Sequence, residues 1–528
     1  MPSILACDRI SEAGLSLLRP RAEVIEAGAL AEDALIEALH GCDALIVRSA
    51  TKVTARVFES APALRVVARA GVGIDNIDVD AATRSGVLVL NSPAGNTLAA
   101  AEHTVAMILA AARNIPQAAA SMKAGNFDRK SFMGRQVSGK TLGVIGLGKI
   151  GAEVARRAAA LGMNLVAHDP YCSPEQADKL GAKLATIPEV LAAADFLTVH
   201  AALTDETRGL IGVDELRQMR PEAILVNCAR GGIVDEAALL AALDAKQIAG
   251  AALDVWENEP NIRQDLALHP LVIATPHLGA STAEAQETVA IDVAEQIRDV
   301  LDGKPPRSPV NVPAVSPELL AELQPFLALA TKLGELARVL VTSAPRGIAV
   351  SASETAPAAG LPLLAGKLIA VALAGRVDVP LNEVNAMYVA RELGIQVSHT
   401  VSTRDRGYGR HLEAEVALQD GTCRLTGAVI EGTQPRILSV NGFSLDLEPE
   451  GQYILIWKRD PRVPGFIGRI GSTLAEAGVG ISSIQVGREV IGDLGLLVAR
   501  LDQTISPEVR ASIMAYPDVV RLEQVAFA

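Results

Sequence analysis

Short, unbroken runs of hydrophobic residues alternate with longer amphipathic stretches through the first half of the chain. Each run is followed within two residues by Arg or Asn, as expected where a buried strand gives way to a turn. Runs of this kind between helices are typical of a parallel sheet covered on both faces. We therefore predict four strands in the first segment, at residues 4–7, 44–47, 66–68 and 87–90, and then one long helix from Leu98 to about Met122.

A second series of hydrophobic runs begins after Lys140 with the spacing of βα repeats. A proline-rich stretch, residues 303–317, then indicates a linker. Beyond it, helical patterns precede strand patterns, and the last 77 residues (452–528) have the order strand, helix, strand, strand, helix, strand of a split βαβ module. The strands predicted for the second series are 141–145, 165–167, 196–199, 223–226, 249–253 and 272–274, and a helix at 282–301 closes it.

Composition excludes several classes of function. The chain has 528 residues, enough for several domains, and a net charge of -13, which argues against broad nucleic-acid binding but leaves room for a local cationic pocket. Five scattered cysteines without a C-x-x-C pair indicate a reducing compartment, and we expect no metal. The N-terminus has no signal-peptide pattern, and the longest apolar stretch, 98–112, is too short to span a membrane. We expect a cytoplasmic protein.

A glycine-rich turn follows the predicted strand 141–145 and opens a helix. Gly146, Gly148 and Gly151 form a G-x-G-x-x-G, in which the first glycine permits a tight turn, the second lets the backbone approach a pyrophosphate, and the third lets the helix pack on the strand. Asp169 lies at the end of the next strand, where its carboxylate can accept both adenosine-ribose hydroxyls and repel a 2′-phosphate. We therefore expect NAD as the cofactor; the alternative is a glycine turn in an ordinary βα unit.

Further motifs resemble the D-2-hydroxyacid dehydrogenase family, in that family's order and spacing across residues 1–312. The resemblance implies two Rossmann-like doubly wound parallel-sheet domains and hydride transfer between NAD and a 2-hydroxy acid. The motifs that carry it, besides the glycine turn, are residues 69–76 (RAGVGIDN), 227–232 (NCARGG), 253–260 (LDVWENEP) and 276–282 (PHLGAST).

Three residues of these motifs suit hydride transfer between NAD and a 2-hydroxy acid. His277 can exchange a proton with the substrate oxygen, because an imidazole titrates near neutral pH. By resemblance to the family's His–Glu pair, Glu259 orients that ring, and the planar fork of Arg230 can bind a carboxylate and polarise a carbonyl. The alternatives are that His277 only makes a structural hydrogen bond within its loop and that Arg230 forms an ion pair with Asp235.

The resemblance also implies a set of cofactor contacts, with Asp254 near the nicotinamide carboxamide. The expected set is Val72, Gly146, Gly148, Lys149, Ile150, Gly151, Asp169, Cys228, Ala229, Arg230, Asp254, His277, Gly279 and Ala280.

Cations at the ends of two strands predict an anionic substrate. Arg48, Lys52 and Arg69 follow strands of one sheet and can converge on a phosphate, and the turn containing Gly71 and Gly73 can present backbone N–H groups to a carboxylate. The alternative is solvated surface charge. Arg129 is a further candidate, since in some relatives a basic residue of this segment reaches a neighbouring subunit's site.

The C-terminal half carries four further motifs: residues 381–386 (LNEVNA), 435–442 (PRILSVNG), 464–468 (PGFIG) and 477–481 (AGVGI). They resemble the additional domains of the long family members that act on 3-phosphoglycerate. The resemblance implies oxidation of 3-phospho-D-glycerate to 3-phosphooxypyruvate at the start of L-serine synthesis, a homotetramer, and a ligand-binding ACT domain for a small-molecule effector. Arg462 stands where serine-binding ACT domains place an acid or amide, with Asp460 nearby, and Gly480 where they place asparagine, so we expect weak or no serine inhibition. The domains expected are 1–97 with 288–312 (substrate-binding), 98–287 (NAD-binding), 313–450 (an α+β intervening domain) and 451–528 (a ferredoxin-like ACT domain).

Two other functions stay open. The chain is either another D-2-hydroxyacid dehydrogenase, including one that reduces 2-oxoglutarate, or a non-enzymatic dinucleotide-sensing corepressor or scaffold. The full set of Arg230, Glu259 and His277 favours an enzyme, but fold analogy alone does not settle a substrate.

Overall fold

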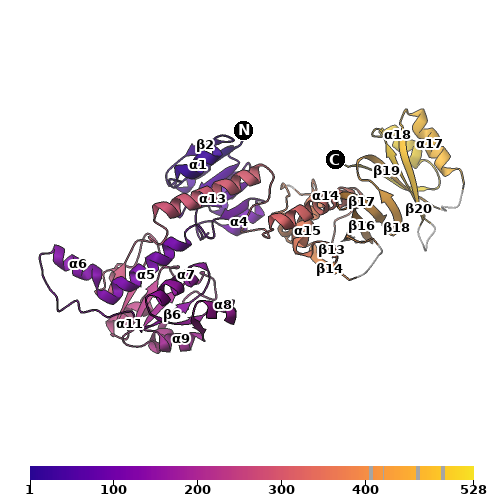
Figure 1. Ribbon diagram of the computed structural model, residues 1–528. Helices are drawn as coiled ribbons and strands as arrows, with labels where there is room; N and C mark the ends of the chain where they lie inside the picture. Colours follow the sequence, from indigo (N-terminus) through magenta and orange to yellow (C-terminus); the bar gives the residue numbers. More distant parts are fainter. Residues whose placement is uncertain (378, 404–407, 420, 460–463, 489–493, 528) are drawn as a thin grey trace.

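The computed structural model describes residues 1–377, 379–403, 408–419, 421–459, 464–488 and 494–527, which form four domains. Figure 1 shows them in an extended row, with the second domain at lower left, the first above it, and the third and fourth to the right. The chain leaves the first domain through α5 (Thr97–Arg113) and returns to it in α13 (Ala283–Leu301). None of the helices in the described ranges is long and apolar enough to cross a membrane.

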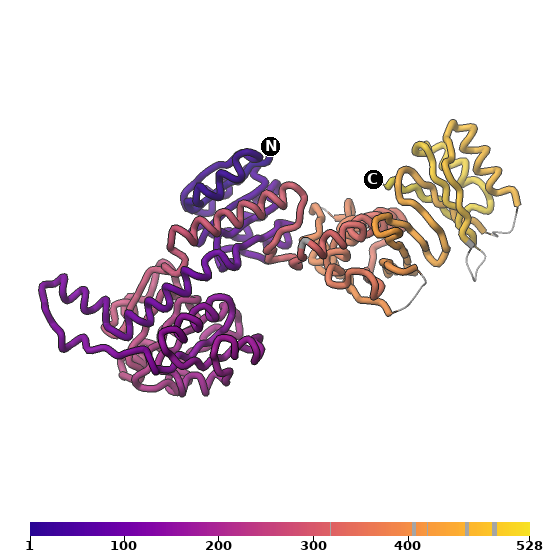
Figure 2. Tube along the Cα trace, viewed as in Figure 1, coloured from indigo at the N-terminus to yellow at the C-terminus, as the bar shows by residue number. Residues whose placement is uncertain are grey.

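The first domain is a five-stranded parallel sheet with the order β2-β1-β3-β4-β5. Its central strand, β3, is fully buried because helices cover both faces of the sheet. Helix α13 packs on α1 so closely that a side chain at Gly14 would clash with the carbonyl of Ala290, and Figure 2 shows α13 lying across this domain. The other elements are β1 (Ser3–Ala6), α1 (Glu12–Leu18), β2 (Glu23–Glu26), α2 (Glu32–Ala38), β3 (Ala44–Val47), α3 (Ala55–Ser60), β4 (Val66–Arg69), α4 (Val79–Arg84) and β5 (Leu88–Asn91).

The second domain is a seven-stranded parallel sheet with the order β12-β11-β10-β9-β6-β7-β8. Strand order reverses between β6 and β9, and open sheets of this type bind ligands at the carboxyl ends of the strands at such a point. Its elements after α5 are α6 (Ile115–Lys123), β6 (Thr141–Ile145), α7 (Lys149–Ala160), β7 (Asn164–His168), α8 (Pro174–Lys179), β8 (Ala182–Leu184), α9 (Ile187–Ala193), β9 (Phe196–Val199), α10 (Val213–Gln218), β10 (Ile224–Asn227), α11 (Glu236–Asp244), β11 (Gly250–Leu253), α12 (Gln264–Ala267) and β12 (Val272–Ala274).

The single helix predicted from Leu98 to Met122 is wrong, because α5 and α6 are separate helices that meet at Asn114. Asn114 has φ +53°, a left-handed conformation that asparagine tolerates better than most residues. Pro116, in the first turn of α6, cannot continue the preceding helix, since its ring would clash with the carbonyl four residues earlier. That carbonyl, of Ala112, accepts a hydrogen bond from the Arg135 N–H at 2.9 Å instead.

The third domain packs α14 and α15 on a six-stranded mixed sheet with the order β14-β13-β15-β16-β17-β18. The fourth is an antiparallel sheet with the order β20-β21-β19-β22 and two helices, which is the βαββαβ arrangement expected from the sequence. The elements are α14 (Pro317–Leu340), β13 (Gly347–Ser353), a 3₁₀ turn (Ala358–Gly360), α15 (Leu361–Leu373), α16 (Ala386–Glu392), β14 (Gln396–Ser402), β15 (His411–Ala417), β16 (Thr422–Ile430), β17 (Gln434–Val440), β18 (Phe443–Leu447), β19 (Gly451–Arg459), α17 (Phe466–Glu476), β20 (Ile481–Arg488), β21 (Leu494–Leu501), α18 (Pro507–Met514) and β22 (Val519–Phe527).

The third and fourth domains share one hydrophobic core. One face of the fourth domain's sheet packs with α17 and α18, whereas the other face, including Leu455, Trp457 and Phe527, belongs to the same buried cluster as α14. Arg521 in β22 adds a hydrogen bond to the Leu340 carbonyl at the end of α14, at 2.8 Å. The two domains are therefore one packing unit.

Deleting residues 451–528 should consequently unfold the third domain rather than only remove the fourth. Seven buried side chains of the fourth domain contribute to the shared cluster. Each is worth about 1.5–3 kcal/mol of burial, so their loss is comparable with the roughly 5–15 kcal/mol that stabilises a whole domain. Calorimetry of the 1–450 chain should lack the third domain's transition, whereas a 1–312 fragment should keep the transition of the first two domains. An unchanged third-domain transition in 1–450 would contradict the shared core.

Candidate active site

A cavity of about 520 Å³ lies at the carboxyl ends of β6, β9 and β10, between the first and second domains. Its volume is within the range of about 300–1,000 Å³ usual for small-molecule sites. Ten of the fourteen cofactor residues predicted from the sequence line it: Val72, Gly148, Lys149, Ile150, Cys228, Ala229, Arg230, His277, Gly279 and Ala280. The sequence motifs therefore converge on one site.

The glycine turn forms a cradle with room for a pyrophosphate. Gly146 has φ +95° and lies against the His200 carbonyl, and a side chain at Gly151 would come within 2.0 Å of the Gly146 carbonyl oxygen. Gly148 caps α7, and nothing lies within 4 Å of the place where its side chain would be. Gly146 and Gly151 thus serve the turn and the helix packing, while Gly148 leaves the helix N-terminus open to an anion.

Asp169 braces this turn from the end of β7. Its Oδ2 accepts a hydrogen bond from the Leu147 N–H at 2.7 Å, and its Oδ1 accepts one from the Tyr171 N–H at 2.8 Å. Asp169 is not among the residues that line the cavity. Its contact with the ribose remains a prediction, and the lone pairs left on both oxygens suit that role.

His277 and Glu259 form a pair at the edge of the cavity. The Nδ1 of His277 lies 2.7 Å from Oε2 of Glu259, and Oε1 of Glu259 accepts a hydrogen bond from the Trp256 N–H at 3.0 Å. Glu259 is therefore held at both oxygens and fixes the imidazole with Nδ1 as its donor. This tautomer leaves Nε2 of His277 to exchange a proton with a substrate.

Arg230 follows β10 and joins the two domains. Its Nε donates a hydrogen bond to Oδ2 of Asp75 in the first domain at 2.9 Å, and the alternative pairing with Asp235 is wrong, because Asp235 caps α11. The Nη2 of Arg230 lies 1.9 Å from where a side-chain carbon on Gly73 would be. Gly73 is therefore needed so that the guanidinium can lie against the backbone.

Arg69 is a half-buried cation that lines the same cavities as His277. With Arg48 it lines a smaller cavity of about 70 Å³ that also includes Gly71, whose backbone it contacts as Arg230 contacts Gly73. Burial, and then the charge of Arg230, lowers the pKa of Arg69 to about 10, so it stays charged at neutral pH. Within the described ranges, its side chain has neither a hydrogen bond nor an ion pair, and its buried Nε is unsatisfied.

Two predicted substrate residues lie elsewhere. Lys52 is exposed and lines neither cavity, and Arg129 is exposed on the loop after α6, outside both. Their substrate roles remain predictions.

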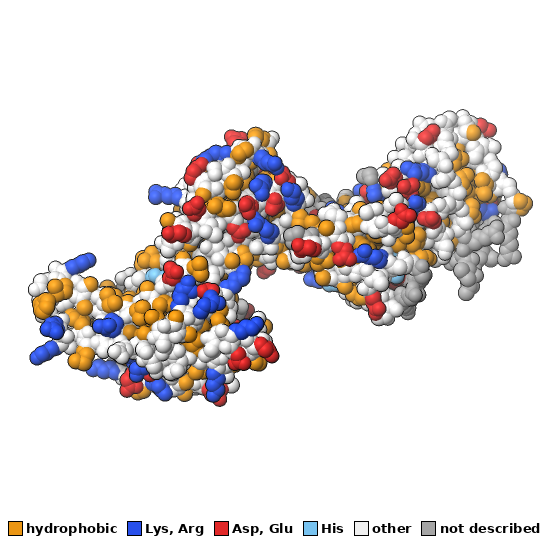
Figure 3. Space-filling model, in the orientation of Figure 1, with side chains coloured by type: hydrophobic (Ala, Val, Ile, Leu, Met, Phe, Trp, Pro, Cys, Tyr) orange, Lys and Arg blue, Asp and Glu red, His pale blue; other side chains and the backbone are white. Residues whose placement is uncertain are grey.

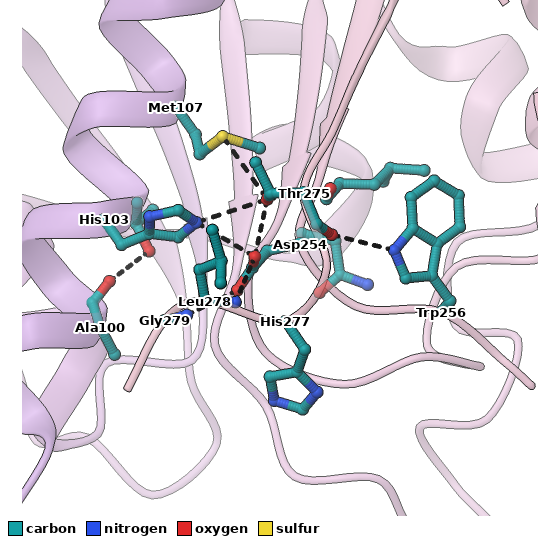
Figure 4. A network of polar contacts seen from close by, with 12 residues as sticks. Ala100, His103, Met107, Asp254, Trp256, Thr275, His277, Leu278 and Gly279 are labelled. Atoms are coloured by element: carbon teal, nitrogen blue, oxygen red, sulfur yellow. Dashed lines mark hydrogen bonds and ion pairs between the residues drawn. The ribbon is translucent and has the colours of Figure 1, made fainter. Parts of the chain in front are cut away.

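Asp254 lies behind the cavity rather than in its wall. Its side chain is 0% exposed, and its carboxylate accepts hydrogen bonds from the Thr275 hydroxyl (2.6 Å) and from the N–H groups of Leu278 (2.7 Å) and Gly279 (2.8 Å). Figure 4 shows this network beside His277. In this conformation Asp254 supports the loop that carries His277, and its place near the nicotinamide carboxamide remains a prediction.

Sequence reasoning missed Asp75, Asn96 and His200, all of which line the larger cavity. His200 follows β9 at the switch point; burial lowers its pKa to about 4, so the ring is neutral, and its Nε2 lies 3.0 Å from the Thr198 hydroxyl. The position of His200 directly after a strand that pairs with β6 could have identified it as a site residue from the sequence. Asp75 was present in the 69–76 motif, but its partner Arg230 lies 155 positions away.

Comparisons with known proteins assign the chain to a family. Residues 105–279 match the model of the D-isomer specific 2-hydroxyacid dehydrogenase NAD binding domain, and residues 322–441 match that of the D-3-phosphoglycerate dehydrogenase intervening domain. The chain is 40% identical to D-3-phosphoglycerate dehydrogenase of Bacillus subtilis over 523 residues, 98% of each protein. The chain belongs to the D-3-phosphoglycerate dehydrogenase family. It is also 41% identical to the Methanocaldococcus jannaschii member over 525 residues, again 98% of both.

Solved structures of shorter family relatives match the catalytic half. The TT0316 protein of Thermus thermophilus is 34% identical with a TM-score of 0.55, covering 58% of this chain and 99% of that one. A glyoxylate reductase from Paecilomyes thermophila is 31% identical with a TM-score of 0.54, covering 59% and 99%. The share of the chain that they cover corresponds in length to the first two domains.

Proposed function

We propose that the chain oxidises 3-phospho-D-glycerate to 3-phosphooxypyruvate with NAD, the first step of phosphorylated L-serine synthesis. The observation that carries the proposal is the half-buried guanidinium of Arg69, which has no hydrogen-bond or ion-pair partner among the described residues and lines the cavity with Arg230 and His277. Desolvation lowers the pKa of this cation, and an anionic substrate supplies the partner that it lacks. Family membership, through relatives named D-3-phosphoglycerate dehydrogenase, supports the choice of anion.

The substrate carboxylate binds between two domains. Arg230 offers its remaining guanidinium donors toward the larger cavity, while Asp75 holds its Nε and fixes the orientation of the fork. The backbone of the turn at Gly71 and Gly73 lies against the guanidinium groups of Arg69 and Arg230. The carboxylate thus meets Arg230, a cation whose orientation Asp75 sets before the substrate arrives.

His277 removes the proton of the substrate hydroxyl. Bound NAD would supply the hydride acceptor, and the cradle at Gly148 fits its pyrophosphate. The Nε2 of His277 takes the hydroxyl proton, and Glu259, 2.7 Å from Nδ1, stabilises the imidazolium that results. Arg230 stabilises the negative charge that develops at the oxygen.

Arg48 and Arg69, which line the smaller cavity next to His277, bind the substrate phosphate. Arg48→Ala should raise KM for 3-phosphoglycerate by about 10-fold or more, since a hydrogen bond to a charged group is worth about 1.5–3 kcal/mol, and should change KM for unphosphorylated D-glycerate little. Lys52→Ala should have a smaller effect because Lys52 lines neither cavity. Arg65→Ala, at the far end of β4, is the matched control; equal changes for both substrates would exclude a phosphate role.

Two alternatives predict different results. Another D-2-hydroxyacid dehydrogenase, such as one that reduces 2-oxoglutarate, would not prefer a phosphorylated substrate. A corepressor or scaffold would bind NAD without turnover, and the held geometry of His277 and Glu259 disfavours it.

We further propose that copies of the chain associate, as a homotetramer in the cytoplasm. Large apolar side chains are exposed on α6 and the loop after it, and Figure 3 shows hydrophobic atoms gathered there at the far left. Exposed apolar patches of this kind mark association surfaces. Arg129 lies on the same loop, where a second copy would bring it to a neighbouring site. The exposed residues are Ile115, Met122, Phe127 and Met133.

We propose that the fourth domain serves as an ACT-like assembly element that binds serine weakly or not at all. Arg462 and Asp460, on which this prediction partly rests, lie outside the described residues. The Gly480 N–H donates a hydrogen bond to Oδ1 of Asp502 at 2.9 Å, and Oδ2 of Asp502 occupies the space of any side chain at position 480. Calorimetry with L-serine should show no saturable binding at micromolar concentrations; such binding, with inhibition, would overturn the proposal.

A further inference from the structure

His103 stands behind the catalytic loop and contacts neither cavity. It lies on α5, its side chain is 20% exposed, and Figure 4 shows its ring directed at Asp254 and Thr275. The Nε2 of His103 is 3.1 Å from Oδ1 of Asp254 and 3.5 Å from the Thr275 hydroxyl. Neither binding nor proton transfer as derived above uses this histidine, although it contacts the residue that supports His277.

Asp254 accepts hydrogen bonds from the backbone of His277 and of the two residues after it. Its backbone carbonyl accepts a hydrogen bond from the His277 N–H at 2.8 Å, and its carboxylate accepts those from Leu278 and Gly279. His277 has φ +56°, a left-handed conformation. The hydrogen bonds to Asp254 hold the backbone that carries the catalytic ring in this conformation.

Several donors keep that carboxylate ionised. Burial alone would raise the pKa of Asp254, but hydrogen bonds from His103, Thr275 and the Leu278 N–H outweigh it, and the pKa is lowered. Thr275 and Leu278 are close to Asp254 in the β11–β12 region, whereas His103 reaches it from the helix that connects the domains. To attract Oδ1, the Nε2 of His103 must carry a hydrogen.

We propose that His103 is a positioning residue for the dehydrogenase reaction: its Nε2–H fixes the Asp254 carboxylate, and through it holds the His277 ring against Glu259. The inference rests on the proposed function. Without that donor, Asp254 has one charge-assisted hydrogen bond fewer, the turn at residues 277–279 loosens, and the His277–Glu259 contact lengthens. Loss of that contact removes the carboxylate that orients the His277 ring and stabilises its imidazolium form.

Substitutions at His103 separate this role from simple packing. His103→Leu fills much of the space without a donor, whereas His103→Gln places an amide N–H near the position of Nε2 without a titrating group. His103→Ala replaces the leucine variant if that one misfolds. Glu102→Gln, at the exposed neighbouring position on α5 that pairs with Arg157, is the matched control.

Two measurements test whether His103 positions His277. In His103→Leu, kcat for 3-phosphoglycerate should fall about 10-fold or more, as expected for one hydrogen bond to a charged group, with NAD affinity and melting temperature close to wild type. The acidic limb of its pH–rate profile should move to lower pH. His103→Gln and Glu102→Gln should behave as the wild type. The charged groups that face His277, namely Glu259, Arg48, Arg69 and Arg230, are unchanged in all three variants.

The second readout does not need turnover. Selective labelling of the eight histidines allows the His277 ring to be observed by NMR in the full chain, with His277→Asn assigning its signal. The chemical shifts of the His277 ring should change in His103→Leu and stay in His103→Gln. Unchanged ring shifts and kcat in His103→Leu, or equal damage in the glutamine variant, would overturn the inference. A wild type that does not oxidise 3-phosphoglycerate would overturn only the proposed function, because the NMR shifts would still test the positioning.

Discussion

Replacing His277 by asparagine is expected to lower kcat by about 10²-fold or more, because the group that takes the substrate proton is lost. Asparagine is the suitable substitute, since it tolerates the left-handed backbone found at φ +56° better than most residues. NAD affinity should change little. Steady-state rates and fluorescence titration of NAD on the same preparation provide the measurement.

Glu259→Gln completes this test. Glutamine keeps an acceptor for the Trp256 N–H but removes the charge that stabilises the imidazolium, so the rate should fall and the acidic limb of the pH–rate profile should shift to lower pH. If His277→Asn kept nearly full turnover, proton transfer would have to be assigned to another residue.

Arg230→Lys should lower kcat/KM for 3-phosphoglycerate by about 10²-fold, although the charge is retained. Lysine lacks the planar fork, so it cannot hold Asp75 and a carboxylate at once, and two hydrogen bonds to charged groups are worth about 3–6 kcal/mol together. Comparing kcat/KM of the two enzymes over a substrate titration is sufficient. Kinetics equal to the wild type would mean that Arg230 only joins the domains.

Gly73→Ala probes the same site without touching the arginine. The new side-chain carbon would lie 1.9 Å from Nη2 of Arg230, so the guanidinium must move away from its position. This variant should therefore lose kcat/KM in the same direction as Arg230→Lys. Gly468→Ala, in a helix of the fourth domain with open space around it, is a glycine control that should leave the rates unchanged.

Buried strands were easier to predict from the sequence than edge strands. The runs at 44–47, 141–145 and 196–199 coincide with β3, β6 and β9, since strands covered on both faces are largely hydrophobic. The edge strands β2 and β8 were missed, because one is largely exposed and the other has only three residues. β19 belongs to the strand–helix order predicted for the last 77 residues, but nothing in the sequence indicated that α14 covers one of its faces.

In the site, motif spacing identified the residues but not their directions. Most predicted cofactor residues line the cavity, because strand ends of a parallel sheet meet at one edge. No pattern in the chain indicated that the Asp254 carboxylate turns inward to hold the loop, or that Lys52 remains in solvent. The pairing of Arg230 with Asp75 depends on how two domains meet, and a pattern within one segment carries no information about that contact.

The most direct test of the central claim is the initial rate of NAD reduction by the full chain with a panel of 2-hydroxy acids, with and without a phosphate group. The panel consists of 3-phospho-D-glycerate, D-glycerate, D-lactate and D-2-hydroxyglutarate. We expect kcat/KM for 3-phospho-D-glycerate to exceed that for D-glycerate by about 10²-fold or more, since the phosphate gains charged hydrogen bonds at Arg48 and Arg69. Equal or higher kcat/KM for any unphosphorylated acid, or NAD binding without turnover of any of the four, would contradict the assignment.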